Sequence, residues 1–362
     1  LWYGAHTRSP SRVEGDKIES DLREYISSNP EELLGRDIVE RFGAELPFLL
    51  KLIAPAKPLS LQVHPSAEEA ALGWVREQRS GVPIDAPHRT YRDHNHKPEM
   101  VYALTEFEAV SGFRAPRRAL EVLAGLEDIP LVSKTVERLH HGASSQGMRS
   151  AFEYMLLGAR DRDADVDDVV ERISARLARD ASPSSHSDSI ALRVAEHHPG
   201  DRGILATLLL NPVTLSPGEA MFVPAGCAHA YLSGLAVEVM ASSDNVVRAG
   251  LTSKYVDART LLDIVDVRPA PPIRLAPERS KPGVEVFYAP VEDFELAVIT
   301  AAPHLSDAGG RGPRIVMAVE GTVEVVCGGS AVTLSPTQAV FLSAADVAGV
   351  RGVGRVVRAS VP

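Results

Sequence analysis

Two segments of this 362-residue chain repeat one strand pattern, and this repeat constrains the fold more than any other sequence feature. Residues 215–226, LSPGEAMFVPAG, match residues 334–345, LSPTQAVFLSAA. Residues 97–110, KPEMVYALTEFEAV, resemble residues 312–326, GPRIVMAVEGTVEVV. Short apolar runs separated by Pro-Gly and Ala-Gly turns are typical of small barrels. A pattern that occurs twice therefore predicts a duplicated barrel.

Two candidate metal ligands occur in only one copy of the repeat. The first alignment places Ala348 opposite His229, and the second places Arg314 opposite Glu99. The apolar positions are kept in both copies, which indicates that Glu99 and His229 are not needed for the fold. We therefore expect no metal in the C-terminal copy.

The stretch at residues 229–254, HAYLSGLAVEVMASSDNVVRAGLTSK, is dense in polar groups inside an otherwise apolar hairpin. In an extended strand His229 and Tyr231 share one face, and Glu238 and Asp244 keep the same period of two between them. Buried acids need partners, so packing alone explains this run poorly.

A second polar strand face precedes it at residues 59–64, LSLQVH. Alternation places Ser60, Gln62 and His64 on one face, which lines a polar cavity or faces water. The solvated face of an edge strand is the commoner arrangement.

Residues 91–99, YRDHNHKPE, add a carboxylate. Lys97 and Glu99 stand two positions apart across Pro98. The proline restricts Lys97 to extended conformations, which helps to set the direction of both side chains.

These strands together supply four potential metal ligands: Gln62, His64, Glu99 and His229. Imidazole nitrogen and carboxylate oxygen suit Zn²⁺, and a glutamine carbonyl is a weak ligand. One carboxylate against a dication leaves a positive site that can stabilise an oxyanion. The spacing is not that of a zinc finger, so the residues alone fit a zinc site and satisfied core histidines equally well.

Residues 113–203 differ from the segments on either side. Apolar positions recur at helical spacing in 119–126 and 166–177, and residues 182–189 read as a serine-rich linker. β signals return at residues 204–210, ILATLLL. The expected parts are a metal-bearing catalytic domain, a helical insertion and a C-terminal degenerate barrel, at residues 1–112 with 204–260, 113–203 and 261–362. Within the last part, the proline-rich residues 260–283 read as a linker.

Charge and cysteine usage limit the partners and the compartment. A net charge of -10 argues against nucleic acid as the main partner. We expect no membrane span, because no apolar run reaches about 18 residues, and no signal peptide is visible. Cys227 and Cys327 form neither a CxxC motif nor a disulfide framework, which favours a cytoplasmic location. The chain opens on Leu1 without a methionine, and we expect an upstream segment before it.

The motifs carry a family resemblance. YRDHNHKPE resembles the first signature of the type I phosphomannose isomerases at every specified position, and residues 229–254 resemble the second. LSLQVHPS and LWYGAH resemble further family segments, so the resemblance covers nearly the whole chain. It implies a mainly β fold of duplicated cupin or jelly-roll barrels with an α-helical insertion domain. Ser253 departs from the family, which usually has proline there, and this could loosen the approach to Lys254.

The resemblance also implies chemistry. It implies one Zn²⁺ per chain held by Gln62, His64, Glu99 and His229, with Arg248 as a catalytic residue. The implied reaction interconverts mannose 6-phosphate and fructose 6-phosphate through a cis-enediol, in the carbohydrate metabolism that leads to GDP-mannose. We expect a small phosphorylated sugar as substrate, and a monomer.

Such an isomerisation needs a base, an acid and a fixed cation. Arg248 could stabilise the enediolate, clamp the phosphate, or do both. The candidates for proton transfer are Lys97, Asp244 and His96, and the sequence does not choose among them. The candidates for substrate binding are Ser60, Lys254, Glu238, Tyr231 and Lys51.

Two other functions compete with this one. A non-catalytic cupin-type module that binds sugar phosphates would keep the zinc ligands but could dispense with Asp244, Arg248 and Lys254. An iron cupin oxygenase usually has two histidines, one carboxylate and open positions. A glutamine ligand beside a cationic pocket fits that oxygenase poorly.

Overall fold

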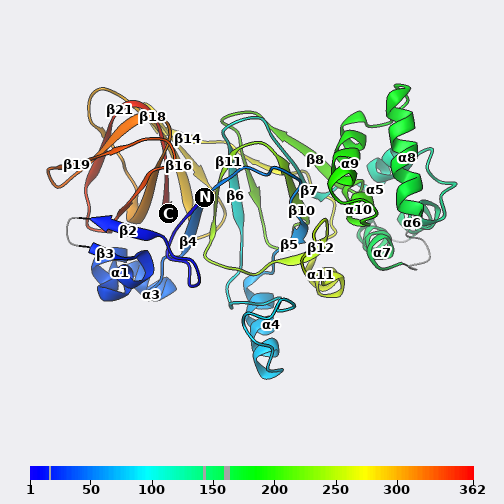
Figure 1. The fold of residues 1–362 in the computed structure, drawn as a ribbon, viewed down its shortest axis with the longest axis horizontal. Coiled ribbons are helices and arrows are strands. Elements are labelled where there is room, and N and C mark those ends of the chain that lie inside the picture. The colour runs from blue at the N-terminus through cyan, green and yellow to red at the C-terminus, as the bar shows by residue number, and fades with distance from the viewer. Residues whose placement is uncertain (16–17, 142–143, 159–163) are drawn as a thin grey trace.

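The structure, a computed structural model, describes residues 1–15, 18–141, 144–158 and 164–362. It is mainly β, with antiparallel sheets in the middle and at one end, and a group of helices at the other end (Figure 1). Within these described ranges, no helix is both long and apolar enough to span a bilayer.

Two sheets face each other in the middle of the molecule. The six-stranded sheet has the order β1 (Trp2–Tyr3), β4 (Phe48–Ile53), β11 (Ala236–Ala241), β6 (Glu99–Ala103), β9 (Ala220–Val223) and β13 (Ile273–Leu275). The five-stranded sheet has the order β12 (Val247–Gly250), β5 (Leu61–Val63), β10 (His229–Ser233), β7 (Phe107–Phe113) and β8 (Leu210–Leu215). Strand alternation turns Val101 and Tyr231 inward, and they belong to one buried cluster between the sheets.

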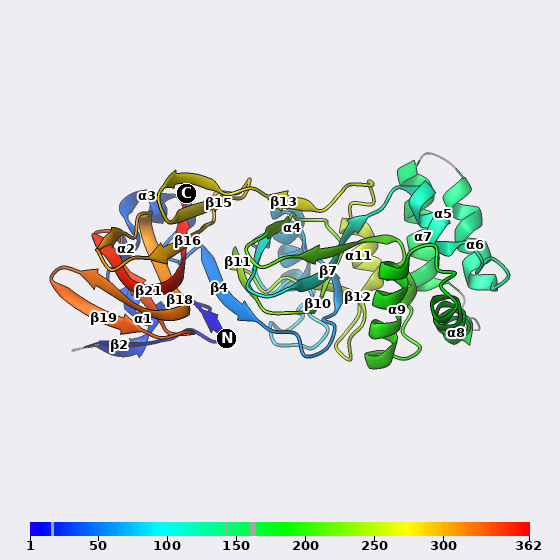
Figure 2. The same cartoon turned by 90° about the horizontal axis from the view of Figure 1, so that it is seen from above.

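The C-terminal sheet lies beside the six-stranded sheet (Figure 2). Its strands are β14 (Glu278–Lys281), β15 (Val284–Tyr288), β16 (Glu295–Ala301), β21 (Ala348–Val361), β18 (Arg311–Cys327) and β19 (Ser330–Leu334), with β17 (Ser306–Asp307) on β21 and β20 (Ala339–Leu342) on β18. Tyr102 and Phe287 meet between the two sheets with ring centroids 5.5 Å apart. They belong to an apolar cluster that joins the two β units.

Equivalent strands of the two β units pair in the same register. Glu99 lies opposite Val223 where β6 pairs with β9, and Arg314 lies opposite Leu342 where β18 pairs with β20. The offsets that align the repeated segments also align these two pairs, so the repeat in sequence is a repeat in strand pairing.

The chain between β7 and β8 forms the helical group. Its helices are α5 (Pro116–Leu123), α6 (Pro130–His140), α7 (Ser144–Leu157), α8 (Ala164–Ala178), α9 (Ser185–His197) and α10 (Gly203–Thr207). Phe113 of β7 meets Phe152 of α7 edge-to-face, 4.9 Å between centroids, which ties the group to the sheet. Two details of the sequence interpretation are wrong, because residues 185–189 belong to α9 and residues 204–207 to α10.

A buried ion pair explains why the serine-rich segment is ordered. Arg176 of α8 donates through Nε to Asp188 of α9 at 2.6 Å, and Asp188 is fully buried. Ser182 donates to the same carboxylate at 2.6 Å, and Arg176 also donates to the carbonyls of Val122 and Ala124. Serine hydroxyls here complete a polar network between helices.

Asp188→Ala is expected to lower the free energy of unfolding by about 3–5 kcal/mol, because it leaves the Arg176 charge buried without its partner. The exposed pair of Arg172 and Asp128 is the matched control, and Asp128→Ala should cost less than about 1 kcal/mol. Urea unfolding followed by circular dichroism measures both. Equal effects of the two substitutions would contradict this role.

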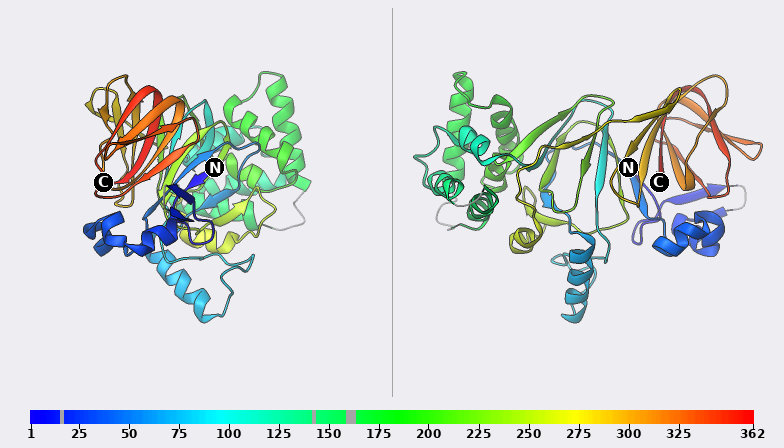
Figure 3. Two further views of the ribbon diagram at one scale, coloured as in Figure 1. Left: turned by 60° about the vertical axis from the view of Figure 1, so that its left-hand side comes forward. Right: turned by 180° about the vertical axis from the view of Figure 1, so that it is seen from behind.

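The remaining helices lie outside the helical group. They are α1 (Leu22–Ser28), α2 (Pro30–Leu34) and α3 (Arg36–Phe42), which follow the hairpin of β2 (Arg12–Gly15) and β3 (Ile18–Asp21), together with α4 (Ala67–Arg79) and α11 (Ala258–Ile264). Helices α1 and α3 lie below the C-terminal sheet in Figure 1 and in both views of Figure 3. The backbone N–H of Ala344 donates to the carbonyl of Leu33 at 2.9 Å.

The segment expected to be a linker, residues 260–283, instead contains most of α11 and all of β13 and β14. Strand β13 pairs with β9 and so covers an edge of the six-stranded sheet. The first 50 residues and the last 100 thus each contact both β units, and the expected domain limits remain a prediction.

Candidate active site

One row of side chains crosses three neighbouring strands of the five-stranded sheet. His229 on β10 and Arg248 on β12 both pair with Gln62 on β5. Cross-strand partners point to the same face, so these three side chains are neighbours. A matching row crosses the six-stranded sheet, where Met240 pairs with Glu99. The site forms where the two rows face each other.

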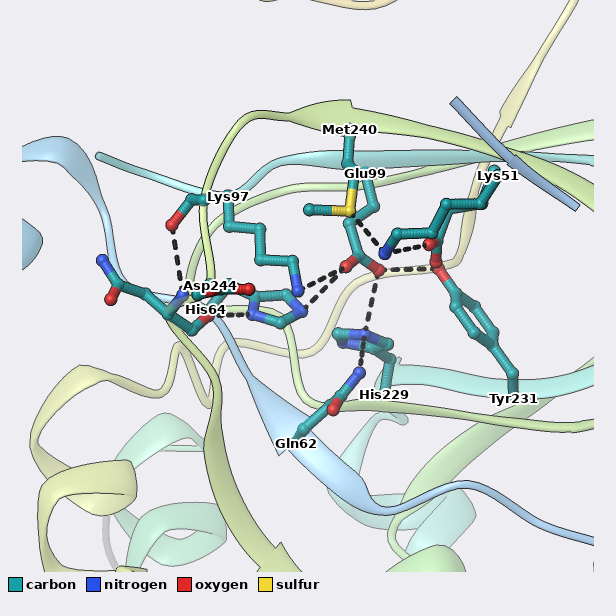
Figure 4. A network of polar contacts seen from close by, with 12 residues as sticks. Lys51, Gln62, His64, Lys97, Glu99, His229, Tyr231, Met240 and Asp244 are labelled. Carbon is teal, nitrogen blue, oxygen red and sulfur yellow. Dashed lines mark hydrogen bonds and ion pairs between the residues drawn. The ribbon is translucent and has the colours of Figure 1, made fainter. Parts of the chain in front are cut away.

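His64, Glu99 and His229 converge at this place (Figure 4). Their ligand atoms all lie within 4.8 Å of one another. Nε2 of His64 is 3.1 Å from Glu99 Oε1, and Nε2 of His229 is 3.4 Å from Glu99 Oε2. All three residues are buried. These are the three strongest ligands expected from the sequence.

Backbone carbonyls set the tautomers of both histidines. Nδ1 of His64 donates to the carbonyl of Asn245 at 2.8 Å, and Nδ1 of His229 donates to the carbonyl of Cys227 at 3.0 Å. Each ring therefore turns Nε2 toward Glu99. Burial lowers the pKa of His64 to about 4, so its ring is neutral near pH 7.

Two imidazole lone pairs that face a carboxylate repel it unless a cation lies between them. His64 Nε2 is buried with no hydrogen-bond partner. Nitrogen and oxygen donors at this spacing suit Zn²⁺, so the site fits the expected metal.

Gln62, the fourth expected ligand, contacts the cluster through its amide. Its Nε2 lies 3.3 Å from Nε2 of His229, while its Oε1 accepts from Ser60 at 3.2 Å. A half turn of the amide would bring Oε1 toward the three other ligands. In this arrangement Ser60 holds Oε1 while the amide nitrogen faces His229.

Tyr231 and Lys97 contact the carboxylate of Glu99. The Tyr231 hydroxyl donates to Oε2 at 3.0 Å, and Nζ of Lys97 lies 3.6 Å from Oε1. Burial lowers the pKa of Lys97 and raises that of Tyr231. Tyr231 is 2 % exposed, so its hydroxyl orients Glu99 from between the two facing sheets.

Tyr231→Phe is expected to weaken zinc binding by roughly 10- to 100-fold, because ligands that lose an orienting hydrogen bond bind metal less well. Tyr102→Phe is the control, since Tyr102 is equally buried but packs against Phe287. Competition with a chromophoric chelator measures both affinities. Unchanged zinc affinity in Tyr231→Phe would show that the hydroxyl does not orient the ligand.

Lys51 and Glu238 form a buried pair beside the cluster. Nζ of Lys51 donates to Glu238 Oε2 at 2.8 Å and lies 2.8 Å from the sulfur of Met240. Burial acts to lower the pKa of Lys51, but the charges of Glu238 and Glu99 outweigh it and raise the pKa. Both residues lie on the sheet opposite Arg248.

Asp244 is held by two N-terminal side chains, His6 and Arg8, that sequence reasoning missed. Its Oδ2 lies 2.9 Å from Nε2 of His6 and 2.5 Å from NH2 of Arg8. Its backbone N–H donates to Asp93 at 2.7 Å. His6 lies in LWYGAH, so the family-like segment was the available signal. No pattern marked Arg8.

Asp93 and Asn245 join the two signature segments and were also missed. Asn245 is fully buried, and its Nδ2 donates to the Asp93 carboxylate at 3.0 Å. Ser243 donates to the same carboxylate at 2.8 Å. The backbone carbonyl of buried Asn245 orients His64. No pattern in a single sequence marks an asparagine with this role.

The other cations lie farther out. Arg248 is half-buried, and both burial and the neighbouring Arg92 lower its pKa. Lys254 is exposed on the bend after β12. His96 points elsewhere, since its Nε2 lies 3.0 Å from both carboxylate oxygens of Asp293 in the C-terminal β unit.

Comparisons with known proteins agree on one family. The sequence profile of the phosphomannose isomerase type I catalytic domain matches residues 1–116. Mannose-6-phosphate isomerase of Escherichia coli K12 is 36% identical over 99% of this chain and 90% of its own length. The rat enzyme of the same name is 33% identical over 90% of this chain and 78% of its own length.

A solved structure adds the fold and the bound groups of a relative. Mannose 6-phosphate isomerase from Salmonella typhimurium, bound to fructose 6-phosphate and zinc, superposes with a TM-score of 0.89 at 33% identity. The match covers 99% of this chain and 90% of that one.

Proposed function

The chain belongs to the type I phosphomannose isomerase family, and on that premise we infer that it interconverts mannose 6-phosphate and fructose 6-phosphate with bound zinc. The observation that carries this inference is the buried convergence of His64, Glu99 and His229. Relatives of the same name and a relative solved with zinc and fructose 6-phosphate support it.

We propose that one zinc ion is held by Gln62, His64, Glu99 and His229. Zinc supplies a Lewis acid that polarises the sugar carbonyl and stabilises negative charge on oxygen. Glu99 is oriented by Tyr231 and His64 by the Asn245 carbonyl.

Lys97 is the proposed group that moves the proton between C1 and C2. Its amine is buried 3.6 Å from the carboxylate of Glu99, one of the proposed zinc ligands. The Asp244 carboxylate is already engaged by His6 and Arg8. Burial alone would raise the pKa of Asp244, but the contacts with His6 and Arg8 outweigh burial and lower the pKa. The lowered pKa makes Asp244 a weak base. Its proposed role is to hold the N-terminal segment over the site.

Arg248 is proposed to stabilise the enediolate from the sheet opposite Glu99. Among the residues that the structure describes, no carboxylate pairs with its planar guanidinium, whose donors can then serve an oxyanion. Lys254 and Arg92 are the proposed phosphate contacts, because both lie outside the buried cluster. Ser60 is proposed to position Gln62, while Lys51 and Glu238 shape the floor of the pocket.

The two β units are proposed to be duplicated cupin-type barrels. The shared register of β6 with β9 and of β18 with β20 supports this. A helical insertion separates parts of the first barrel, and the second barrel keeps the apolar pattern without the ligands. A monomeric state and a cytoplasmic location remain predictions.

Elemental analysis combined with a mannose 6-phosphate turnover assay tests the proposed function. The expected result is one zinc per chain and turnover that stops when a chelator removes it. A non-catalytic sugar-phosphate module would bind substrate without converting it, and an oxygenase would hold iron. Two metals per chain would contradict a metal-free second barrel.

A further inference from the structure

The C-terminal barrel carries two buried arginines where the first barrel carries two buried acids. We propose that the cavity around Arg314 and Arg358 binds a small oxyanion of the phosphate class, free or esterified. This site is separate from the zinc site, and the proposal does not depend on the isomerase activity.

Strand register shows that the replacement is position for position. Arg314 occupies the place of Glu99, as the pairing of β18 with β20 shows. Arg358 of β21 pairs with the residue two positions after Arg314, and Glu238 of β11 pairs with the residue two positions after Glu99. Both acids of the first barrel thus correspond to cations in the second.

The two arginines line a cavity of about 540 Å³. Arg314 is 4% and Arg358 is 3% exposed. In the described part of the chain, Nε of each guanidinium is buried and has no hydrogen-bond partner. A buried donor without an acceptor is costly, so each Nε marks a place where an acceptor is missing.

The charge of the pair is only partly balanced. NH2 of Arg358 donates to Glu295 at 2.6 Å. Arg314 donates only to the carbonyls of Gly309, Ser343 and Asp346. Across the described ranges no carboxylate lies within ion-pair distance of Arg314, and exposed Arg311 lines the same cavity.

An oxyanion supplies what the cavity lacks. The donors of a guanidinium match the oxygens of a phosphate better than they match a metal ion or a neutral sugar. A buried positive charge is stabilised most by a negative charge beside it. Burial lowers the pKa of both arginines, and an anion would offset that cost. Glu295, Asp307 and Asp346 also line the cavity, and Glu295 is already paired with Arg358.

Titration of the zinc-loaded full chain with inorganic phosphate, followed by calorimetry, tests the proposal. Phosphate is expected at two sites, one that competes with sugar-phosphate turnover and one that does not. Arg314→Gln should weaken the non-competing site at least about tenfold, since it removes a charge-assisted contact. The inhibition constant of phosphate for turnover should not change.

Arg355→Gln is the matched control, because Arg355 lies on β21, the strand of Arg358, but pairs with Glu320 at the surface. Arg311→Ala, at the exposed rim, covers the case in which Arg314→Gln does not fold, and should weaken the same site several-fold. Titration with glycerol phosphate distinguishes a phosphate ester from free phosphate as the ligand of this cavity. Tighter binding of glycerol phosphate than of phosphate indicates a phosphomonoester, and equal or weaker binding indicates the free ion. A single site that competes with turnover, or equal affinity in folded Arg314→Gln, would overturn the proposal.

Discussion

His229→Ala and Glu99→Ala are each expected to abolish bound zinc and to lower turnover by at least ~10²-fold, because both the cation and its charge stabilisation are lost. Each substitution leaves two ligand atoms of the buried trio, which is too few to hold the metal against solvent. Metal analysis after gel filtration, with the turnover of mannose 6-phosphate, measures both effects.

His304→Ala is the control for these substitutions, because His304 is exposed in the C-terminal β unit. It should keep full zinc and full turnover. Both ligand variants should stay folded, since the C-terminal β unit has alanine and arginine at the aligned positions. Turnover retained by a zinc-free variant would remove the metal from the mechanism.

Arg248→Ala is expected to lower turnover by roughly 10²- to 10³-fold while zinc content stays at one per chain, because a preorganised cation opposite the developing charge is lost. The guanidinium is half-buried beside Gln62 and binds no carboxylate within the described residues, so its removal leaves the ligands in place. Steady-state kinetics and elemental analysis on the same preparation measure both.

Arg248→Lys separates charge from geometry, since it keeps the cation but loses the planar fork. It should recover part of the lost turnover. Arg117→Ala, an exposed substitution on α5, should behave like the parent. Loss of zinc from Arg248→Ala would make Arg248 a structural residue.

The sequence pattern predicted much of the site, because Gln62 and His229 stand at strand positions whose direction follows from local alternation, and His64 directly follows the strand of Gln62. His229 and Tyr231 do share a face, and Ser60, Gln62 and His64 do point toward the same region. The helical insertion also followed from periodicity. Local patterns failed where burial outweighed propensity, as with the serine-rich start of α9, which the buried Asp188 anchors.

The sequence by itself determined which donors are present and that one repeat has them while the other does not. Only the tertiary structure decided what those donors do. Asp244 is pinned by Arg8, 236 residues away, and the tautomer of His64 depends on a carbonyl 181 residues away. Contacts of this range arise when two sheets close on each other, and no local rule of alternation or spacing contains that closure.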